Sequence, residues 1–176
     1  MTTRFYRCET PSIDVTAVSI QGLSIRIWQP CRDGLPRYGA LRWANLVWWT
    51  LQRLGLFARD DFAELTIWRE EQLLHRLIVT PRWYRFPFMT GRDLQIGALW
   101  THPAARGRGL ARAAIGEALR RFDGKGGRFW YVVDSTNHAS IRLIESCGFE
   151  LVGTGRRTHP LGLRLFGRFR LDSMLA

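Results

Sequence analysis

A short glycine-rich, basic segment is the part of the sequence best suited to chemistry. It runs from Arg106 to Arg112, reads RGRGLAR, and follows an apolar run that ends at a proline. Glycines let the backbone approach a ligand closely, and the N-terminus of a following helix carries roughly half a positive charge. The arginines add charge-assisted donors. The segment therefore predicts a pyrophosphate site, with a solvated loop and ordinary helix capping as the alternative.

A second segment spans residues 137–149 and reads NHASIRLIESCGF. The two segments together resemble the coenzyme A motifs of the GNAT acetyltransferase superfamily. There, an Arg or Gln, two variable residues, a Gly, one variable residue and a Gly or Ala follow a hydrophobic strand and a proline, here Leu99 to Pro103. The downstream helix of the superfamily begins with Asn, has a small residue three positions on, and closes with Gly-Phe. The second half of the chain is thus similar to acetyl-CoA-dependent N-acetyltransferases.

The resemblance implies where the coenzyme lies. In this superfamily the strand that would end at Thr101 and the strand Phe129–Asp134 run parallel and splay apart at a bulge, and the pantetheine arm lies between them. Acetyl-CoA is the expected co-substrate, and no metal is expected. The residues that the resemblance assigns to coenzyme binding are Leu99, Trp100, Thr101, Arg106, Gly107, Arg108, Gly109, Leu110, Ala111, Arg112, Asn137 and Ser140.

The groups that move protons differ from those of the relatives. Superfamily members usually transfer acetyl directly to an amine, and deprotonating a Lys-like ammonium (pKa about 10.4) at neutral pH costs roughly 4 to 5 kcal/mol. Ile144 stands where many relatives have a tyrosine acid, and Gly97 where they often have an acidic residue. Transfer by proximity alone is one alternative. The candidate replacements, each with a structural role as its own alternative, are Gln95, His75, His138 and Ser146, and further Asp93, His102 and Ser135.

An aromatic and basic run, residues 81–89, suggests the acceptor side. Arg82 and Arg85 suit a negative group, and Trp83 and Tyr84 suit a ring. The predicted acceptor is a small amine, anionic or sugar-nucleotide-like. The alternative is that these aromatic residues close the core beneath a long loop.

Charge and aromatic content keep two other functions open. Lys and Arg outnumber Asp and Glu by 26 to 15, which gives a net charge of +11. Such a chain could bind RNA or DNA without catalysis, although the arginines are scattered and several belong to the coenzyme motif. A peripheral-membrane enzyme that acylates a lipid-linked or longer-chain substrate is the other alternative. Neither nucleic acid nor a membrane surface is the favoured partner.

Hydrophobic periodicity places the motifs on a mixed α/β framework. Alternation predicts a strand over 15–28, bent at Gly22, and an antiparallel meander over 64–69, 73–80 and 94–101. A helix over 109–122, a strand over 129–134, a helix over 137–146 and strands near 150–155 and 163–171 follow. The resemblance implies a GNAT-like acyl-CoA N-acyltransferase fold of about six or seven mostly antiparallel strands, with helices on both faces and a splayed parallel pair.

A further helix is predicted over 39–57, stopping near Gly55. Its period gathers polar residues in one arc and leaves a broad apolar face, which is expected to pack on the core or to form a dimer surface rather than an acceptor pocket. The polar arc comprises Arg42, Asn45, Thr50, Gln52 and Arg53, and the apolar face comprises Trp43, Leu46, Val47, Leu51 and Leu54.

The remaining features concern the number of domains, the cysteines and the cellular compartment. The size suits one domain over residues 1–176, with no repeat or linker to divide it. Cys8, Cys31 and Cys147 form no disulfide or zinc pattern, no secretory signal is visible, and arginines interrupt the apolar stretch 38–58. These features predict a cytoplasmic protein, monomeric or homodimeric.

Overall fold

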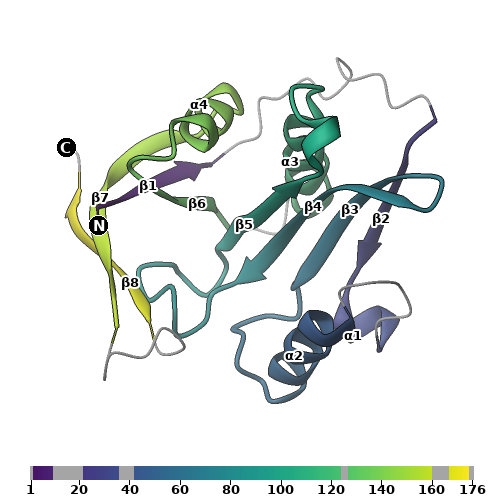
Figure 1. Ribbon diagram of the computed structural model, residues 1–176. Coiled ribbons are helices and arrows are strands. Elements are labelled where there is room, and N and C mark those ends of the chain that lie inside the picture. The colour runs from purple at the N-terminus through teal and green to yellow at the C-terminus, as the bar shows by residue number, and fades with distance from the viewer. Residues whose placement is uncertain (1, 10–21, 36–41, 124–126, 160–166, 175–176) are drawn as a thin grey trace.

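The computed structural model describes residues 2–9, 22–35, 42–123, 127–159 and 167–174, shown in Figure 1. These residues form one eight-stranded sheet with helices on both faces. The elements in chain order are β1 (Thr3–Cys8), β2 (Ser24–Trp28), α1 (Pro30–Asp33), α2 (Arg42–Arg53), β3 (Ala63–Arg69), β4 (Gln72–Pro81), β5 (Leu94–Thr101), a 3₁₀ turn (Pro103–Ala105), α3 (Leu110–Phe122), β6 (Phe129–Asp134), α4 (His138–Ser146), β7 (Glu150–Thr158) and β8 (Arg168–Met174).

The strand order in the sheet is β2-β3-β4-β5-β6-β1-β7-β8. Every neighbouring pair is antiparallel except β5 and β6, which are parallel. The predicted fold class is therefore confirmed, but the sheet has eight strands rather than six or seven. The additional strand is β1, which enters the middle of the sheet between β6 and β7.

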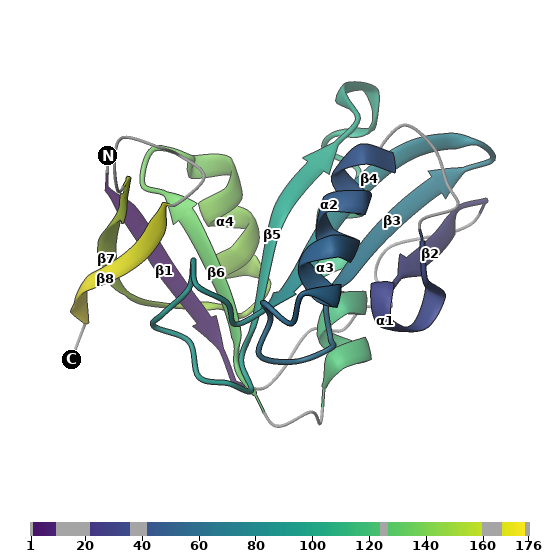
Figure 2. The ribbon, with the colours of Figure 1, turned by 90° about the horizontal axis from the view of Figure 1, so that it is seen from below.

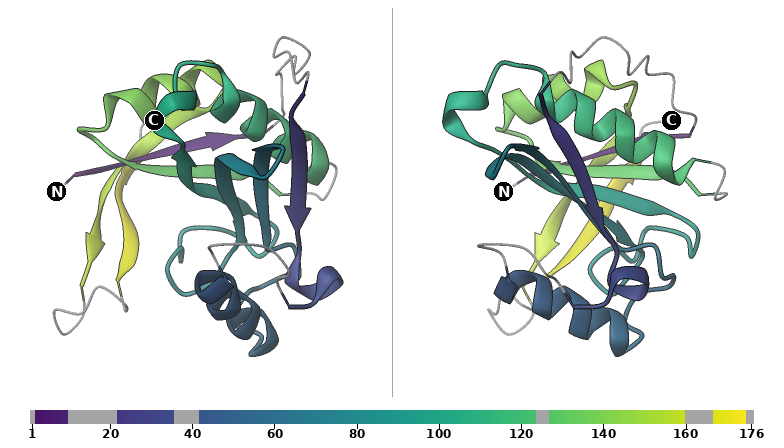
Figure 3. Two further views of the ribbon diagram at one scale, coloured as in Figure 1. Left: turned by 45° about the vertical axis from the view of Figure 1, so that its right-hand side comes forward. Right: turned by 90° about the vertical axis from the view of Figure 1, so that its right-hand side faces the viewer.

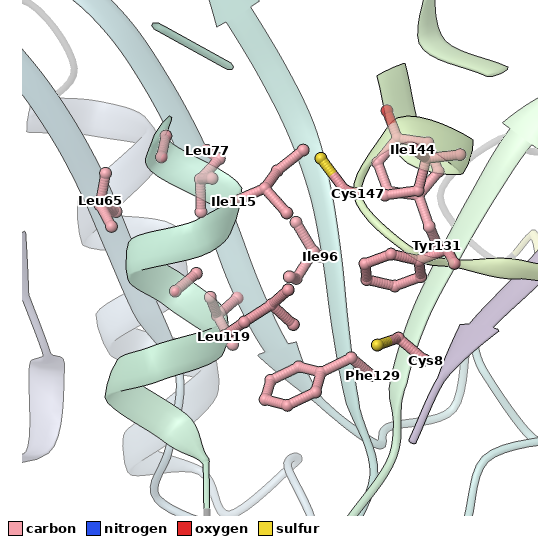
Figure 4. Packing of buried hydrophobic residues seen from close by; sticks show 14 of the residues in the cluster. Cys8, Leu65, Leu77, Ile96, Ile115, Leu119, Phe129, Tyr131, Ile144 and Cys147 are labelled. Atoms are coloured by element: carbon pink, nitrogen blue, oxygen red, sulfur yellow. The ribbon is translucent and has the colours of Figure 1, made fainter. Parts of the chain in front are cut away.

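Helices α3 and α4 cover one face of the sheet, and α1 and α2 cover the other (Figure 3). Ile115 and Leu119 of α3 are buried against Leu77 and Ile96 of the sheet, as Figure 4 shows. Complete burial of one such side chain contributes about 1.5 to 3 kcal/mol. A separate aromatic cluster lies on the α2 face and includes Phe5, Phe57, Phe62, Trp83, Phe86 and Trp130.

Helix α2 is amphipathic as predicted, but its buried face is rotated from the predicted one. Asn45, predicted to be in the polar arc, is buried, whereas Val47 and Leu54 are 56% and 68% exposed. Two interactions account for the rotation. Asn45 hydrogen-bonds the buried Glu64 of β3, and the Trp48 ring stacks on Phe62 with centroids 5.0 Å apart. The helix ends at Arg53, and Gly55 has a φ of 66°, in agreement with a stop there.

The predicted strands and helices from residue 63 to residue 158 match the structure within a few residues. In contrast, β1 and the four-residue α1 were not predicted. Residues 15–21 of the first predicted strand and 163–166 of the last lie outside the described residues. In the described part of the chain, no helix has the length and apolarity that crossing a membrane requires.

Candidate active site

The parallel strands β5 and β6 separate partway along their length. Leu94, Gln95 and Ile96 pair with Phe129, Trp130 and Tyr131, and no later pair joins the two strands in the described residues. Both strands nevertheless continue, to Thr101 and to Asp134. Figure 2 shows the ribbons of β5 and β6 diverging from each other. The splayed parallel pair implied by the resemblance is thus present.

A β-bulge in β5 lies directly after the point of separation. Gly97 pairs with Ile78 of β4 and Trp100 pairs with Arg76, so two residues of β5, Ala98 and Leu99, stand opposite one residue of β4. Ala98 has a φ of 50°, which is uncommon for a residue other than glycine. The bulge changes the direction of the strand as it leaves β6. Leu99 packs against the α3 side of the core, while Trp100 is 38% exposed.

The N-terminus of α3 presents a concentration of unpaired backbone donors. Gly107 and Gly109 both have a φ of 75°, in the left-handed region that favours glycine. The first helical hydrogen bond runs from Ala113 N to Gly109 O, and among the described residues the N–H groups of residues 107–112 have no partner. Such a run of N–H groups at a helix N-terminus attracts anions.

Space and charge around this turn agree with that role. A Cβ added at Gly107 would meet no atom within 4 Å, so a ligand can approach the backbone there. The side chains of Arg106, Arg108 and Arg112 are exposed. Arg106 is the one held toward the strand end, because its Nε donates to the carbonyl of Thr101 at 3.4 Å. These features fit a pyrophosphate.

The start of α4 borders the same region. Asn137 is the N-cap, and its Oδ1 accepts a hydrogen bond from Ser140 N at 3.1 Å. Ser140 is partly buried near Tyr131, the last residue of β6 that pairs with β5. Burial raises the pKa of the Tyr131 phenol, and a hydrogen bond with Ser140 acts in the opposite direction. Sequence reasoning missed Tyr131 because it looked for a tyrosine only at position 144.

Two of the predicted catalytic residues are buried in strands, on opposite faces of the sheet. Gln95 Nε2 donates to the carbonyl of Ile96 at 2.7 Å, and its amide fills the space that a Cβ at Gly97 would occupy. His75 is 0% exposed, and its Nδ1 is 2.8 Å from the Thr101 hydroxyl. Its Nε2 has no hydrogen-bond partner among the described residues. Burial lowers the pKa of His75 to about 4, so the ring is neutral at pH 7.

The other candidates lie on turns and helix ends. His138 is exposed at the first residue of α4, and the Ser146 hydroxyl donates to the carbonyl of Leu143 in its last turn. His102 Nδ1 accepts from Ala104 N and caps the 3₁₀ turn. Ser135 N donates to Thr2 O next to β1. The structure therefore does not gather the predicted catalytic residues at one point.

Asp93 has a structural environment. Its carboxylate accepts hydrogen bonds from Thr90 N at 2.8 Å, Arg128 N at 3.1 Å and Trp130 Nε1 at 2.9 Å. Burial acts to raise the pKa of Asp93, but these hydrogen bonds outweigh it and the net pKa is lowered. The carboxylate thus ties the start of β5 to the start of β6, just before their three shared pairs.

The aromatic run predicted to bind the acceptor is divided between core and surface. Trp83 is buried in the α2-face cluster, beside Trp48 and Phe57. The guanidinium of Arg85 lies 5.1 Å from the Trp83 ring centroid. Tyr84 is partly buried and Arg82 is exposed. The alternative interpretation, that the aromatic residues close the core, therefore describes Trp83, while Arg82 and Tyr84 remain at the surface.

A polar cluster on the α2 face was missed by sequence reasoning. Glu64 of β3 is 5% exposed, and its Oε2 accepts a hydrogen bond from Asn45 Nδ2 at 2.8 Å. Arg76 of β4 approaches Oε1 at 4.0 Å. We call these three residues the Glu64 cluster. They are separated in the sequence and meet only where α2 packs on the neighbouring strands β3 and β4, so no local pattern could reveal them.

A comparison with protein families finds the acetyltransferase (GNAT) family, whose model matches residues 33–149. This chain belongs to the GNAT acetyltransferase family. A comparison with curated protein sequences finds no match. The family assignment therefore rests on the family match, and solved structures add the likeness of fold.

Solved structures share the GNAT fold at low sequence identity. An acetyltransferase of the GNAT family from Streptococcus pneumoniae has a TM-score of 0.54 and 15% identity, over 77% of this chain and 88% of that protein. The ribosomal-protein-S18-alanine N-acetyltransferase from Escherichia coli has a TM-score of 0.51 and 19% identity, over 77% and 83%. An aminoglycoside N-acetyltransferase in complex with CoA has a TM-score of 0.50 and 17% identity, over 72% and 91%.

Other structural relatives are longer than this chain. It spans 61% of a GNAT-family protein from Novosphingobium aromaticivorans, 48% of a Drosophila protein and 58% of a Staphylococcus epidermidis protein, while 87% of this chain is covered in each case. At 13 to 16% identity these likenesses concern the fold.

Proposed function

We propose that this GNAT-family protein transfers the acetyl group of acetyl-CoA to the amine of a small acceptor. The observation that carries the proposal is the combination of the β5–β6 separation with the unpaired N–H groups at the start of α3. A thioester arm that ends between the strands and a pyrophosphate at the helix N-terminus would require both features together.

Different segments of the chain would bind different parts of acetyl-CoA. The N–H groups of residues 107–112, assisted by Arg106 and Arg108, would hold the pyrophosphate. Residues 99–101, beyond the bulge, offer backbone groups to the pantetheine arm. Asn137 and Ser140 border the arm from the start of α4. Acetyl-CoA supplies the activated acetyl group, and no metal is required of the protein.

The acceptor would approach from the α2 face of the sheet. Gln95 and Gly97 face that side, since the space for a Cβ at Gly97 is filled by the Gln95 amide and Gln95 pairs with Trp130 of the α2-face cluster. Trp100, Arg82 and Tyr84 remain accessible to a ring or an anionic group. We therefore keep a small amine acceptor, anionic or sugar-nucleotide-like, as the favoured class.

The proposal predicts that acetyl-CoA binding depends on the α3 N-terminus. The double variant Arg106→Ala, Gly109→Glu removes one charge-assisted donor and places a carboxylate where the pyrophosphate would lie. Each lost charge-assisted hydrogen bond costs about 1.5 to 3 kcal/mol, so we expect acetyl-CoA affinity to fall by roughly 100-fold or more. Isothermal titration calorimetry measures this loss, followed by thiol release against a panel of amines.

The matched control is Arg121→Ala, which removes an exposed arginine from the other end of the same helix. The control should bind acetyl-CoA with wild-type affinity. Wild-type protein that is folded but binds neither acetyl-CoA nor longer acyl-CoAs would contradict the proposal.

One observation favours the peripheral-membrane alternative strongly enough to keep it. Three apolar side chains are exposed on α2 and in the residues that follow it: Val47, Leu54 and Leu56. Arg53, the last residue of the helix, is exposed beside them. An apolar helix face flanked by arginine is typical of helices that lie on anionic bilayers. Co-sedimentation with phosphatidylglycerol vesicles distinguishes this alternative, since an enzyme acting on a water-soluble amine has no reason to bind them.

A further inference from the structure

The Glu64 cluster contains a buried carboxylate with incomplete partners. Oε2 of Glu64 accepts the Asn45 hydrogen bond, whereas Oε1 is buried and accepts none from the described residues. The guanidinium of Arg76 approaches it, with Nη1 4.0 Å from Oε1. A buried carboxylate that is only partly paired lowers stability. Packing of α2 against the sheet therefore does not by itself explain a glutamate at this position.

The strand register places Glu64 in line with the point where β5 leaves β6. Glu64 pairs with Ile78 of β4, and Ile78 pairs with Gly97 of β5. Directly paired residues share a face, and adjacent strands lie about 4.8 Å apart, so the Cα atoms of Glu64 and Gly97 are separated by roughly 10 Å. Gly97 is also the first residue of β5 after its last pair with β6. The carboxylate therefore lies on the face and in the cross-strand row from which an acceptor would reach the thioester.

The surroundings of Glu64 are mostly uncharged. On its own sheet, β2 places Trp28 opposite it, and β4 supplies Arg76. Helix α2 supplies the neutral Asn45. Burial raises the pKa of Glu64, and Asn45 and Arg76 act in the opposite direction with a smaller effect. A carboxylate whose pKa lies closer to neutrality is a better base than an exposed one.

We propose that Glu64 is the proton acceptor for the amine substrate, acting through a bridging water molecule and replacing the acidic residue that is absent at Gly97. The inference rests on the proposed acetyl transfer and adds to it the group that deprotonates the acceptor.

One N–H bond of the acceptor ammonium breaks, and its proton passes through the water to Glu64 Oε1. The freed nitrogen lone pair forms a bond to the thioester carbonyl carbon, and the C–S bond breaks with its electron pair on sulfur. The second proton on nitrogen passes to that sulfur and gives the free thiol. Glu64 then releases its proton to solvent.

The test compares Glu64→Gln with wild type and with the control Glu71→Gln. Glutamine keeps the shape of Glu64 and an oxygen for Asn45, while Glu71 is an exposed glutamate on the β3–β4 turn. Thiol release from acetyl-CoA is followed with ethanolamine, glucosamine 6-phosphate, spermidine and an alanine-terminated peptide as probes, over a range of pH. Hydroxylamine, which is largely unprotonated at neutral pH, serves as the probe that needs no base. Acetyl-CoA affinity is measured for each variant.

The expected result is a loss that depends on the protonation state of the probe. At neutral pH, Glu64→Gln should lower kcat/KM for the best ammonium probe by about 100-fold or more, because general bases contribute on that order. The loss should shrink as pH rises toward the pKa of the ammonium, and it should nearly vanish with hydroxylamine. Glu71→Gln should stay within about two-fold of wild type. Acetyl-CoA affinity should not change.

Two outcomes would overturn the role of Glu64 as the base without contradicting acetyl transfer itself. The first is that Glu64→Gln keeps the wild-type kcat/KM and pH profile. The second is that Glu64→Gln loses as much activity with hydroxylamine as with the ammonium probe. The second would identify a purely structural role. If circular dichroism shows that Glu64→Gln is unfolded, Glu64→Asp is tested in its place. Its loss of activity with the ammonium probe should also vanish with hydroxylamine. A loss that persists with hydroxylamine would refute the role of Glu64 as the base. Wild-type protein that binds no acetyl-CoA, or transfers to no probe, contradicts the proposed function itself, and this inference with it.

Discussion

At the scale of single residues, the same strands carry titratable groups with different roles. His75 and Glu64 are both buried, and each has one side-chain atom without a hydrogen bond among the described residues. His75 is neutral and bound to Thr101, whereas Oε1 of Glu64 lies on the α2 face, 4.0 Å from Arg76. Asp93 is held by three hydrogen bonds and links two strands. Burial alone therefore does not identify a catalytic group, and the direction in which its free atoms face is what distinguishes Glu64.

The buried state of His75 predicts a specific pH dependence of stability. In the unfolded chain this histidine gains a proton near pH 6.5, whereas in the folded protein burial lowers its pKa to about 4. Its contribution to stability is therefore complete above about pH 6.5 and is lost as the pH falls toward 4. We expect the wild-type free energy of unfolding to fall by about 3 kcal/mol more than that of His75→Gln between pH 7 and pH 4, measured by urea denaturation.

Glutamine is the chosen replacement because its amide can still bond the Thr101 hydroxyl. The matched control is His138→Gln, which replaces an exposed histidine instead of the buried one. Parallel loss of stability in wild type and His75→Gln would show that the ring is not held neutral by burial.

At the scale of elements, the bulge in β5 positions the site and carries backbone strain. Ala98 has a φ of 50°, a left-handed value that glycine adopts with less strain, and it lies where β5 separates from β6. The bulge thus lowers the stability of β5 and changes the direction of residues 99–101. The start of α3 has no such strain, because the two left-handed positions there are glycines.

The strain at Ala98 predicts that one glycine substitution is stabilising. Ala98→Gly should raise the free energy of unfolding by about 0.5 to 1 kcal/mol, because relief of the positive φ exceeds the added entropy of the unfolded chain. Ala139→Gly, at an exposed position in α4, should lower it by about 1 kcal/mol. Chemical denaturation compares the two, and a loss of stability in both variants would argue against strain in the bulge.

The sequence predicted these elements well where local signals were strong. From β3 to β7, alternation, helix periodicity and the glycine turns identified each strand and long helix. Strand β1 was missed because Arg4 and Arg7 interrupt its apolar residues, although it lies between two strands in the sheet. The face of α2 was mispredicted because two contacts with residues distant in the sequence, Asn45 with Glu64 and Trp48 with Phe62, determine its rotation.

At the scale of the whole molecule, the two faces of the sheet have separate tasks. The α3 and α4 face carries the continuous aliphatic core and the glycine turn, and the α2 face carries the aromatic cluster and the Glu64 cluster. The proposed coenzyme half of the site consists of contiguous motifs, so the sequence alone indicates it. The proposed acceptor half combines residues of α2, β3, β4 and β5, which come together only in the folded sheet, so no local pattern indicates it.

The net charge of +11 is consistent with a polyanionic co-substrate. Exposed arginines at positions 106, 108 and 112 surround the proposed pyrophosphate position. The same charge would also attract nucleic acid, so the position at which an anion binds is more informative than whether it binds. A measurement that shows where on the protein acetyl-CoA binds is therefore the most direct test of the proposed coenzyme site.

That measurement is amide hydrogen exchange of the wild-type protein with and without acetyl-CoA, followed by mass spectrometry. We expect slower exchange on acetyl-CoA binding in residues 107–112 and 97–101, where the N–H groups lack partners or follow the last β5–β6 pair, and no change in β2 or β8. Protection that is absent, or that falls elsewhere in the sheet, would contradict the claim that acetyl-CoA binds where β5 and β6 separate.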